Sequence, residues 1–104
     1  MAAYVVSRVQ IRDADAMLRY VTEAPATVAA FGGRYHFRGS TVEALEGSWE
    51  HDRLVVLEFP SRADALAWYE SDLYRPLRDL RQAAAETTIL LADGDAVPPM
   101  TGTV

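Results

Sequence analysis

The sequence predicts an α+β domain in which four antiparallel strands form one sheet and helices cover one face of it. Segments of alternating apolar and polar residues, typical of strands, take turns with segments whose apolar residues recur at helical spacing. Their order along the 104 residues is strand, helix, strand, strand, one or two helices, strand. Two split units of this kind in so short a chain are typical of the ferredoxin-like arrangement.

The first strand is expected over residues 4–11, where alternating side chains predict two different faces. A helix should follow from Asp13, whose carboxylate suits an N-cap, and end at Gly32-Gly33. Pro25 lies inside this helix, so we expect a kink or break near residues 22–24.

The second strand is expected over residues 34–39, with residues 41–45 as its continuation. Residues 46–52 read as a hairpin loop that leads into the third strand. That strand, residues 53–59, contains an unbroken apolar run, which predicts a central place in the sheet.

Ser61 with Asp64 three residues later resembles a capping box and should begin the next helix. A break at residues 71–72 and Pro76 in a first turn predict a separate last helix. The fourth strand is expected over residues 87–92.

In this arrangement we expect the first and third strands to lie side by side and parallel, with one sheet face uncovered. A chain of this length leaves much apolar surface exposed, so a second copy of the chain is the expected partner on that open face. Residues 1–93 are predicted to form the single domain, and residues 94–104 a flexible or partner-contacting tail.

Composition excludes several functional classes. The chain has no cysteine, which rules out disulfides and thiol chemistry, and no lysine, which rules out a Schiff base. A net charge of −5 argues against nucleic acid as the main partner. No apolar run approaches the roughly 18 residues of a membrane span, and the N-terminus lacks signal-peptide features, so we expect a cytoplasmic protein.

No signature of a cofactor is present in the sequence. Gly32-Gly33 lacks the frame of a phosphate-binding loop, and there is no nucleophile elbow. His36 and His51 are too far apart in the chain to suggest a metal site. We therefore expect neither cofactor nor metal.

Polar residues on strand faces are the sharpest candidates for chemistry. Arg8 and Glu58 would lie level on one sheet face if their strands run parallel, either as a structural or dimer-interface ion pair or with Glu58 as general base. His36 shares a predicted face with Arg34 and Arg38, and suits proton transfer on a small anion held by Arg38. The alternative for His36 is a surface histidine on an edge strand.

Large amphipathic side chains either line a ligand pocket or build the core between helix and sheet. Trp49 lies in a predicted loop, where a tryptophan suggests a partner surface, and Glu46 is expected in the same region. Arg75, Arg78 and Arg81 recur among acidic residues and predict a solvated, salt-bridged helix face rather than an anion patch. The expected ligand-contacting residues are Tyr4, Glu46, Trp49, Trp68, Tyr69 and Tyr74.

Several short stretches carry a resemblance to a known family, among them Phe31-Gly32-Gly33-Arg34-Tyr35, Leu45-Glu46-Gly47-Ser48-Trp49 and Ala67-Trp68-Tyr69-Glu70-Ser71. Over roughly residues 3–92 the sequence resembles the bacterial proteins grouped as domain of unknown function 1330, in the dimeric α+β barrel superfamily. The resemblance implies a ferredoxin-like monomer that dimerises through its sheet, with no agreed activity. Related families include cofactor-free monooxygenases, isomerases, cyclases and haem-binding enzymes.

Together these features predict a small homodimer that binds a small organic molecule. As an enzyme it would transform that molecule by cofactor-free acid/base chemistry of the isomerase, cyclase or monooxygenase type. His36 or Glu58 would move the proton, and Arg8 or Arg38 would stabilise the developing oxyanion. The alternative is a non-catalytic ligand-binding or interaction protein, and a pocket that contains His36 or Glu58 would favour the enzyme.

Overall fold

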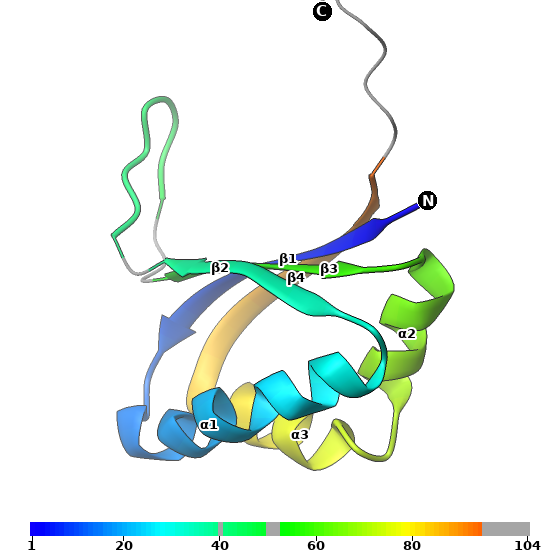
Figure 1. The fold of residues 1–104 in the computed structure, drawn as a ribbon. Helices are drawn as coiled ribbons and strands as arrows, with labels where there is room; N and C mark the ends of the chain where they lie inside the picture. The colour runs from blue at the N-terminus through cyan, green and yellow to red at the C-terminus, as the bar shows by residue number, and fades with distance from the viewer. Residues whose placement is uncertain (40, 50–52, 95–104) are drawn as a thin grey trace, which may run out of the picture.

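A computed structural model describes residues 1–39, 41–49 and 53–94. Figure 1 shows one layer of strands above one layer of helices, which confirms the predicted α+β class. The residues 95–104 of the expected tail and His51 lie outside the described residues. The elements, in chain order, are β1 (Ala3–Ile11), α1 (Ala14–Ala30), β2 (Arg34–Gly39), β3 (Arg53–Phe59), α2 (Arg62–Glu70), α3 (Arg75–Ala84) and β4 (Ala85–Asp93).

The strands form one antiparallel sheet in the order β2-β3-β1-β4, which is the ferredoxin-like topology. The first and third strands are adjacent, as predicted, but the expectation that they run parallel is wrong. Because α1 carries the chain back to the end of the sheet where β1 began, β1 and β2 run in the same direction. The reversal between β2 and β3 then sets β3 against β1.

This direction also separates two candidate residues. Glu58 lies opposite Tyr4, and Arg8 lies opposite Leu54. Four positions along a strand span about 13 Å. The prediction that Arg8 and Glu58 lie level is therefore wrong, although both belong to the open face of the sheet.

The helix starts follow the predicted caps. The Asp13 carboxylate accepts a hydrogen bond from the Ala16 backbone N–H (3.1 Å), and the Ser61 hydroxyl accepts one from Asp64 N–H (3.1 Å). The helix stops at Gly32, whose φ of 76° is a left-handed conformation that favours glycine, and Gly33 is needed because a Cβ there would lie 2.6 Å from the Phe59 ring.

One helix of 17 residues continues through Pro25, so the predicted break near residues 22–24 does not occur. Proline has no N–H and leaves the carbonyl four residues earlier without its helical donor. That carbonyl belongs to Val21, and the Arg38 guanidinium of β2 donates to it over 3.5 Å. A contact between helix and sheet thus takes the place of the missing helical hydrogen bond.

The core lies between the helices and the sheet and centres on Trp68. This indole is 2 % exposed and packs on the rings of Phe59 and Tyr74, at centroid distances of 5.3 and 4.1 Å. Its Nε1–H donates to the Thr27 hydroxyl of α1 (3.0 Å), so the polar atom is satisfied. This hydrogen bond joins α1 to α2 on the helix-covered side of the sheet.

A β-bulge at His36 changes which residues of β2 share a face. Tyr35 lies opposite Leu57, but the pairing then shifts, and Arg38 lies opposite Val55. The extra residue moves Arg38 to the helix-facing side, while His36 stays on the open face beside the Tyr4 ring. The expectation that His36 and Arg38 share one face is therefore wrong.

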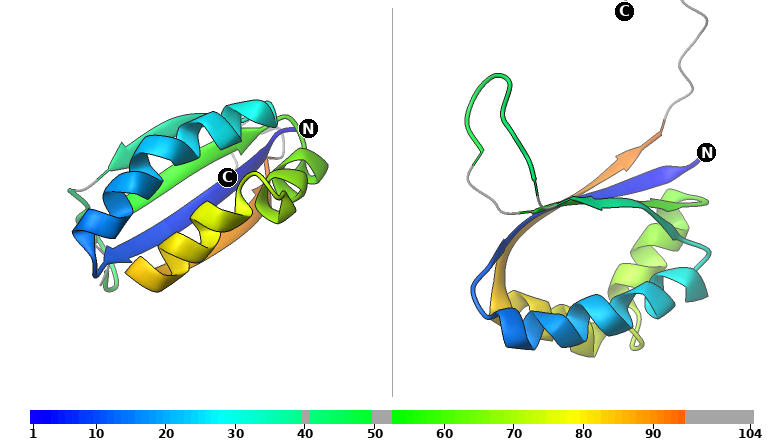
Figure 2. Two further views of the ribbon diagram at one scale, coloured as in Figure 1. Left: turned by 90° about the horizontal axis from the view of Figure 1, so that it is seen from below. Right: turned by 60° about the vertical axis from the view of Figure 1, so that its left-hand side comes forward.

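Described helices leave the other face of the sheet uncovered, as the right view of Figure 2 shows. Phe37 and Leu90 are 48 % and 61 % exposed on it. Residues 41–49 do not continue β2, contrary to the expectation for residues 41–45, and they rise above this face as an irregular loop (Figure 1). β4 begins at Ala85, two residues before its predicted start.

Within the described residues, no helix is long and apolar enough to span a membrane. Nor do the described His, Asp and Glu side chains form a group of three that suits a metal ion.

Candidate functional site

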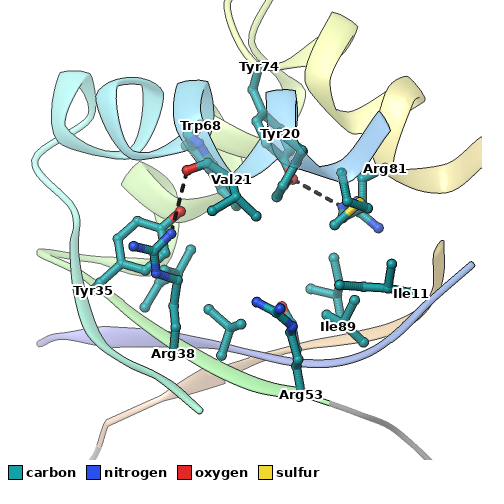
Figure 3. A pocket seen from close by; sticks show the side chains of 15 residues that line it. Ile11, Tyr20, Val21, Tyr35, Arg38, Arg53, Trp68, Tyr74, Arg81 and Ile89 are labelled. Carbon is teal, nitrogen blue, oxygen red and sulfur yellow. Dashed lines mark hydrogen bonds between the residues drawn. The ribbon is translucent and has the colours of Figure 1, made fainter. Parts of the chain in front are cut away.

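A cavity lies between the sheet and the helices, and Figure 3 shows its lining. Its empty volume is about 590 Å³ with the solvent at its mouth included, but only about 50 Å³ of it has room for the centre of a water molecule. The cavity is therefore narrow. Its walls are mainly apolar and aromatic, with Val9, Ile11, Met17, Tyr20, Tyr35, Trp68, Tyr74 and Ile89 among them.

Three arginines reach this cavity, and no described Asp or Glu lines it. Arg38 and Arg53 extend from the sheet towards the helices, and Arg81 approaches from the helix layer (Figure 3). None of the three forms an ion pair with a described residue. In a chain of net charge −5, this is a local concentration of positive charge without counter-ions among residues 1–39, 41–49 and 53–94.

Arg38 lies at the β2 side of the cavity and is held by contacts that leave its charge uncompensated. Its guanidinium carbon lies 5.2 Å from the centre of the Tyr35 ring, within cation–π range. Its hydrogen bond to the Val21 carbonyl is long, at 3.5 Å. Burial raises the pKa of the Tyr35 hydroxyl to about 12, so this phenol is a hydrogen-bond donor at neutral pH.

Tyr20, Tyr74 and Arg81 form a hydrogen-bonded group at the other end of the cavity. The two hydroxyls lie 2.5 Å apart, and Arg81 Nε–H donates to the Tyr74 oxygen over 3.4 Å. Burial, together with the neighbouring Tyr74, raises the pKa of Tyr20 well above its ordinary value. Burial opposes the charge of Arg81, but the Tyr74 and Tyr20 hydroxyls outweigh it and raise the pKa of the guanidinium. The group therefore holds a protonated Tyr20 phenol and the Tyr74 hydroxyl beside a permanent cation.

The open face carries a separate polar cluster. Glu58 Oε1 lies 2.5 Å from His36 Nε2 and accepts a hydrogen bond from Arg34 Nη2 over 3.2 Å. Hydrogen bonding to His36 and then to Arg34 holds the pKa of the Glu58 carboxyl below its ordinary value. The Tyr4 ring adjoins His36 at a centroid distance of 5.5 Å. We call Tyr4, Arg34, His36 and Glu58 the open-face cluster.

The predicted site residues thus divide between the two sides of the sheet. Arg38, Trp68 and Tyr74 line the cavity, whereas Tyr4, Arg8, His36 and Glu58 belong to the open face. Trp49 folds over Arg8, whose guanidinium carbon lies 5.4 Å from its ring centre, and Glu46 is exposed in the loop. Tyr69 lies outside the cavity lining. The centre of its ring lies 6.2 Å from that of Trp68 and 5.0 Å from the guanidinium carbon of Arg78.

Tyr20, Tyr35, Arg53 and Arg81 line the cavity but are absent from the residues predicted for the site. The expectation that Arg81 belongs to a solvated face is wrong, since it is only 4 % exposed. The signal that finds it is helical spacing, because Leu77, Arg81 and Ala84 recur at intervals of four and three and are the buried residues of α3.

Solved structures of similar fold are distant in sequence. A protein of unknown function from Rhodopseudomonas palustris, RPA0582, matches with a TM-score of 0.78 and 19 % identity, over 92 % of this chain and 84 % of its own. A dimeric ferredoxin-like protein of unknown function from Jannaschia sp. CCS1 matches with a TM-score of 0.73 and 9 % identity, over 90 % and 100 %. SnoaB, a cofactor-independent oxygenase from Streptomyces nogalater, matches with a TM-score of 0.66 and 11 % identity, over 95 % and 98 %.

These identities are too low to carry more than the fold. No curated protein matches the sequence. A family model does match, over residues 2–95, and its description is a domain of unknown function, DUF1330. Because this match covers most of the chain, the protein belongs to the DUF1330 family, as its sequence motifs predicted.

Proposed function

We propose that this protein binds a small, largely apolar organic molecule with an anionic oxygen in the cavity between sheet and helices. The observation that carries the proposal is the convergence of Arg38, Arg53 and Arg81 on a space that no described carboxylate lines. Arg81 is buried, Arg53 is partly buried and Arg38 is exposed, so their combined positive charge at an apolar space favours an anionic ligand. Apolar walls with a few convergent polar groups are typical of small-molecule sites.

Different walls of the cavity would contact the apolar and the anionic part of such a ligand. Its apolar body would pack against Trp68 and Tyr35, while its anionic oxygen would meet the guanidinium of Arg53 or Arg38. Arg38 is exposed and only weakly held by Val21, so its side chain can move to admit a ligand into the narrow space. Binding would therefore involve a side-chain rearrangement at the mouth rather than a rigid fit.

Acid/base chemistry without a cofactor is the enzymatic form of this proposal. In the cavity the Tyr20–Tyr74 hydroxyl pair, rather than His36 or Glu58, would donate a proton to the carbon of a bound enolate to give the keto form, with Arg81 stabilising the phenolate until water returns the proton. The likeness to a cofactor-independent oxygenase supports this reaction class through the fold alone. The alternative is ligand binding without catalysis.

We also propose that the protein is a homodimer through the open sheet face. Exposed Phe37 and Leu90 lie on that face, and structures of similar fold are described as dimeric. In such a dimer the open-face cluster would lie at or near the interface. Substitution of Phe37 by Asp should convert dimer to monomer in analytical ultracentrifugation, and a wild type that sediments as a monomer would contradict the proposal.

The binding proposal is tested with aromatic carboxylates and phenolates, each paired with its neutral methyl ester or ether. The variant Trp49→Phe leaves Trp68 as the only tryptophan and therefore as a reporter inside the cavity. We expect the anion to change Trp68 fluorescence and its neutral partner to bind at least about tenfold more weakly, the worth of one hydrogen bond to a charged group.

Arg53→Gln should weaken anion binding by a similar factor. Arg19→Gln is the matched control, because Arg19 is an exposed arginine that pairs with Glu23 away from the cavity. Equal binding of the anion and its neutral partner, or equal losses in Arg53→Gln and Arg19→Gln, would contradict an anion site in this cavity.

A further inference from the structure

A second hollow runs along the β4 side of the molecule, outside the cavity just described. It consists of two adjoining pockets that share Tyr69 and Ile89, and we call it the side groove. In the left view of Figure 2, α2 and α3 follow one another along this side of the sheet. One end of the groove is polar, with Arg81, Gln82 and Thr87, and the other is apolar, with Val5, Leu66 and Leu91.

At the polar end two hydrogen-bonding groups have no partner among the described residues. Arg81 Nη2 and Thr87 Oγ1 are both shielded from solvent, and neither makes a hydrogen bond there. The Arg81 residue is 4 % exposed, so its unpaired N–H groups cannot turn to bulk water. A buried donor left unpaired costs free energy that a bound acceptor would recover.

The orientation of Arg81 is fixed from its other side. Its Nε–H donates to the Tyr74 hydroxyl, and its guanidinium carbon lies 5.9 Å from the centre of the Tyr20 ring. These contacts leave Nη2 without a hydrogen-bond partner among the described residues. No described Asp or Glu lines either pocket, so no described carboxylate supplies the acceptor.

We propose that the side groove binds an amphiphilic carboxylic acid. Its carboxylate would accept hydrogen bonds from Arg81 Nη2 and the Thr87 hydroxyl, with the Gln82 amide beside them. Its apolar tail would pass Ile89 and Tyr69 and lie between Leu66 of α2 and Leu91 of β4. Two acceptor oxygens on one carbon match two neighbouring donors, and the apolar end requires a tail that a free inorganic anion does not have.

This site is separable from the cavity between sheet and helices. Thr87 and Gln82 line the side groove alone, while Arg38 and Arg53 line the cavity alone. The proposal therefore stands even if the cavity binds no anion. Arg81 touches both, so it is unsuited as the diagnostic substitution.

The diagnostic variant is Thr87→Val, which keeps the shape of the side chain and removes the hydroxyl. Its matched control is Thr88→Val, because Thr88 is the exposed neighbour on the opposite face of β4. The ligands are octanoate, octanol, acetate and inorganic phosphate, titrated into the uniformly ¹⁵N-labelled protein and followed by NMR. The reporters are the Arg81 Nε and Gln82 side-chain resonances.

We expect octanoate to shift both reporters, with octanol, acetate and phosphate at least about tenfold weaker. Thr87→Val should weaken octanoate binding about tenfold, as expected for a lost hydrogen bond to a charged group. Thr88→Val should bind octanoate like the wild type. Thr87→Val should also melt no lower than the wild type without ligand, because it removes an unpaired buried hydroxyl.

Equal binding of octanoate and octanol would overturn the carboxylate end of the proposal. Phosphate binding as tight as that of octanoate would overturn the apolar end and leave a simple oxyanion site. Unchanged octanoate affinity in Thr87→Val would overturn the placement. A loss in Arg53→Gln instead would assign octanoate to the cavity between sheet and helices.

Discussion

Charged side chains on the two faces of the sheet differ in their interaction partners. On the open face, Glu58 binds both His36 and Arg34, while Arg8 lies against the Trp49 ring without an ion pair among the described residues. On the helix-facing side, Arg38, Arg53 and Arg81 have aromatic rings, hydroxyls and a backbone carbonyl around them, but no described carboxylate. Paired charges on an exposed face contribute structure or recognition, whereas uncompensated charges in an interior cost stability and point to a ligand.

The largest expected effect concerns packing on the helix-facing side. Trp68→Ala should lower the free energy of unfolding by about 3–5 kcal/mol, because it removes a nearly buried ring that contacts Phe59 and Tyr74. Phe37→Ala on the open face should cost less than about 1 kcal/mol in dilute protein. Urea denaturation of the two variants measures the contrast, and similar losses would mean that the open face is packed in solution.

Arg81→Met should raise the free energy of unfolding of the ligand-free protein by about 1 kcal/mol, because an apolar side chain of similar length replaces a buried guanidinium whose Nη2 has no hydrogen-bond partner among the described residues. The same variant should lose anion binding. Arg34→Met, which removes an exposed partner of Glu58, should leave stability nearly unchanged. A strongly destabilised Arg81→Met would show instead that this arginine is part of the structural core.

The Tyr35 phenol of the cavity should release its proton at a higher pH than an exposed tyrosine does. Burial raises the pKa of Tyr35 to about 12, so the folded protein keeps this proton above the pH at which the unfolded chain releases it. The stability contribution is complete below the unfolded value near 10 and is lost as pH rises towards 12. Absorbance titration near the tyrosinate band should lose a late component in Tyr35→Phe, and an unchanged curve would contradict the burial.

The smallest effect is expected at Glu58. Its pKa is lowered in the folded protein, so its contribution is present above the ordinary value of 4.5 and is lost as pH falls through the lower folded value. Glu58→Gln should therefore lower Tm slightly near neutral pH, and the Tm values of the two proteins should converge as pH falls below 4.5. Added salt should reduce the difference between the two proteins.

Local signals in the sequence placed most of the elements. Asp13 and Ser61 begin their helices as predicted, because each offers an oxygen to an N–H that the helix leaves unpaired. The apolar run of β3 lies between β1 and β2, as its composition predicted. Such features depend on near neighbours in the chain, so the sequence displays them directly.

The candidate site was less accessible from the sequence. Alternation along the strand predicted that Arg38 shares a face with His36. A bulge places Arg38 on the opposite face, and this bulge depends on the pairing of β2 with β3. A charge pattern assigned Arg81 to solvent, although helical spacing with Leu77 and Ala84 favoured burial. Pro25 predicted a break in α1, but contacts with the rest of the fold hold that helix together.

The sequence by itself determined the class of fold, the family, the helix caps and the absence of thiol and imine chemistry. These depend on residue type and short-range spacing. Only the tertiary structure decided which side of the sheet each charge occupies, because strand direction and a one-residue bulge are set by pairing between distant segments. That choice moved the candidate chemistry from a histidine and a carboxylate on the open face to tyrosines and arginines inside.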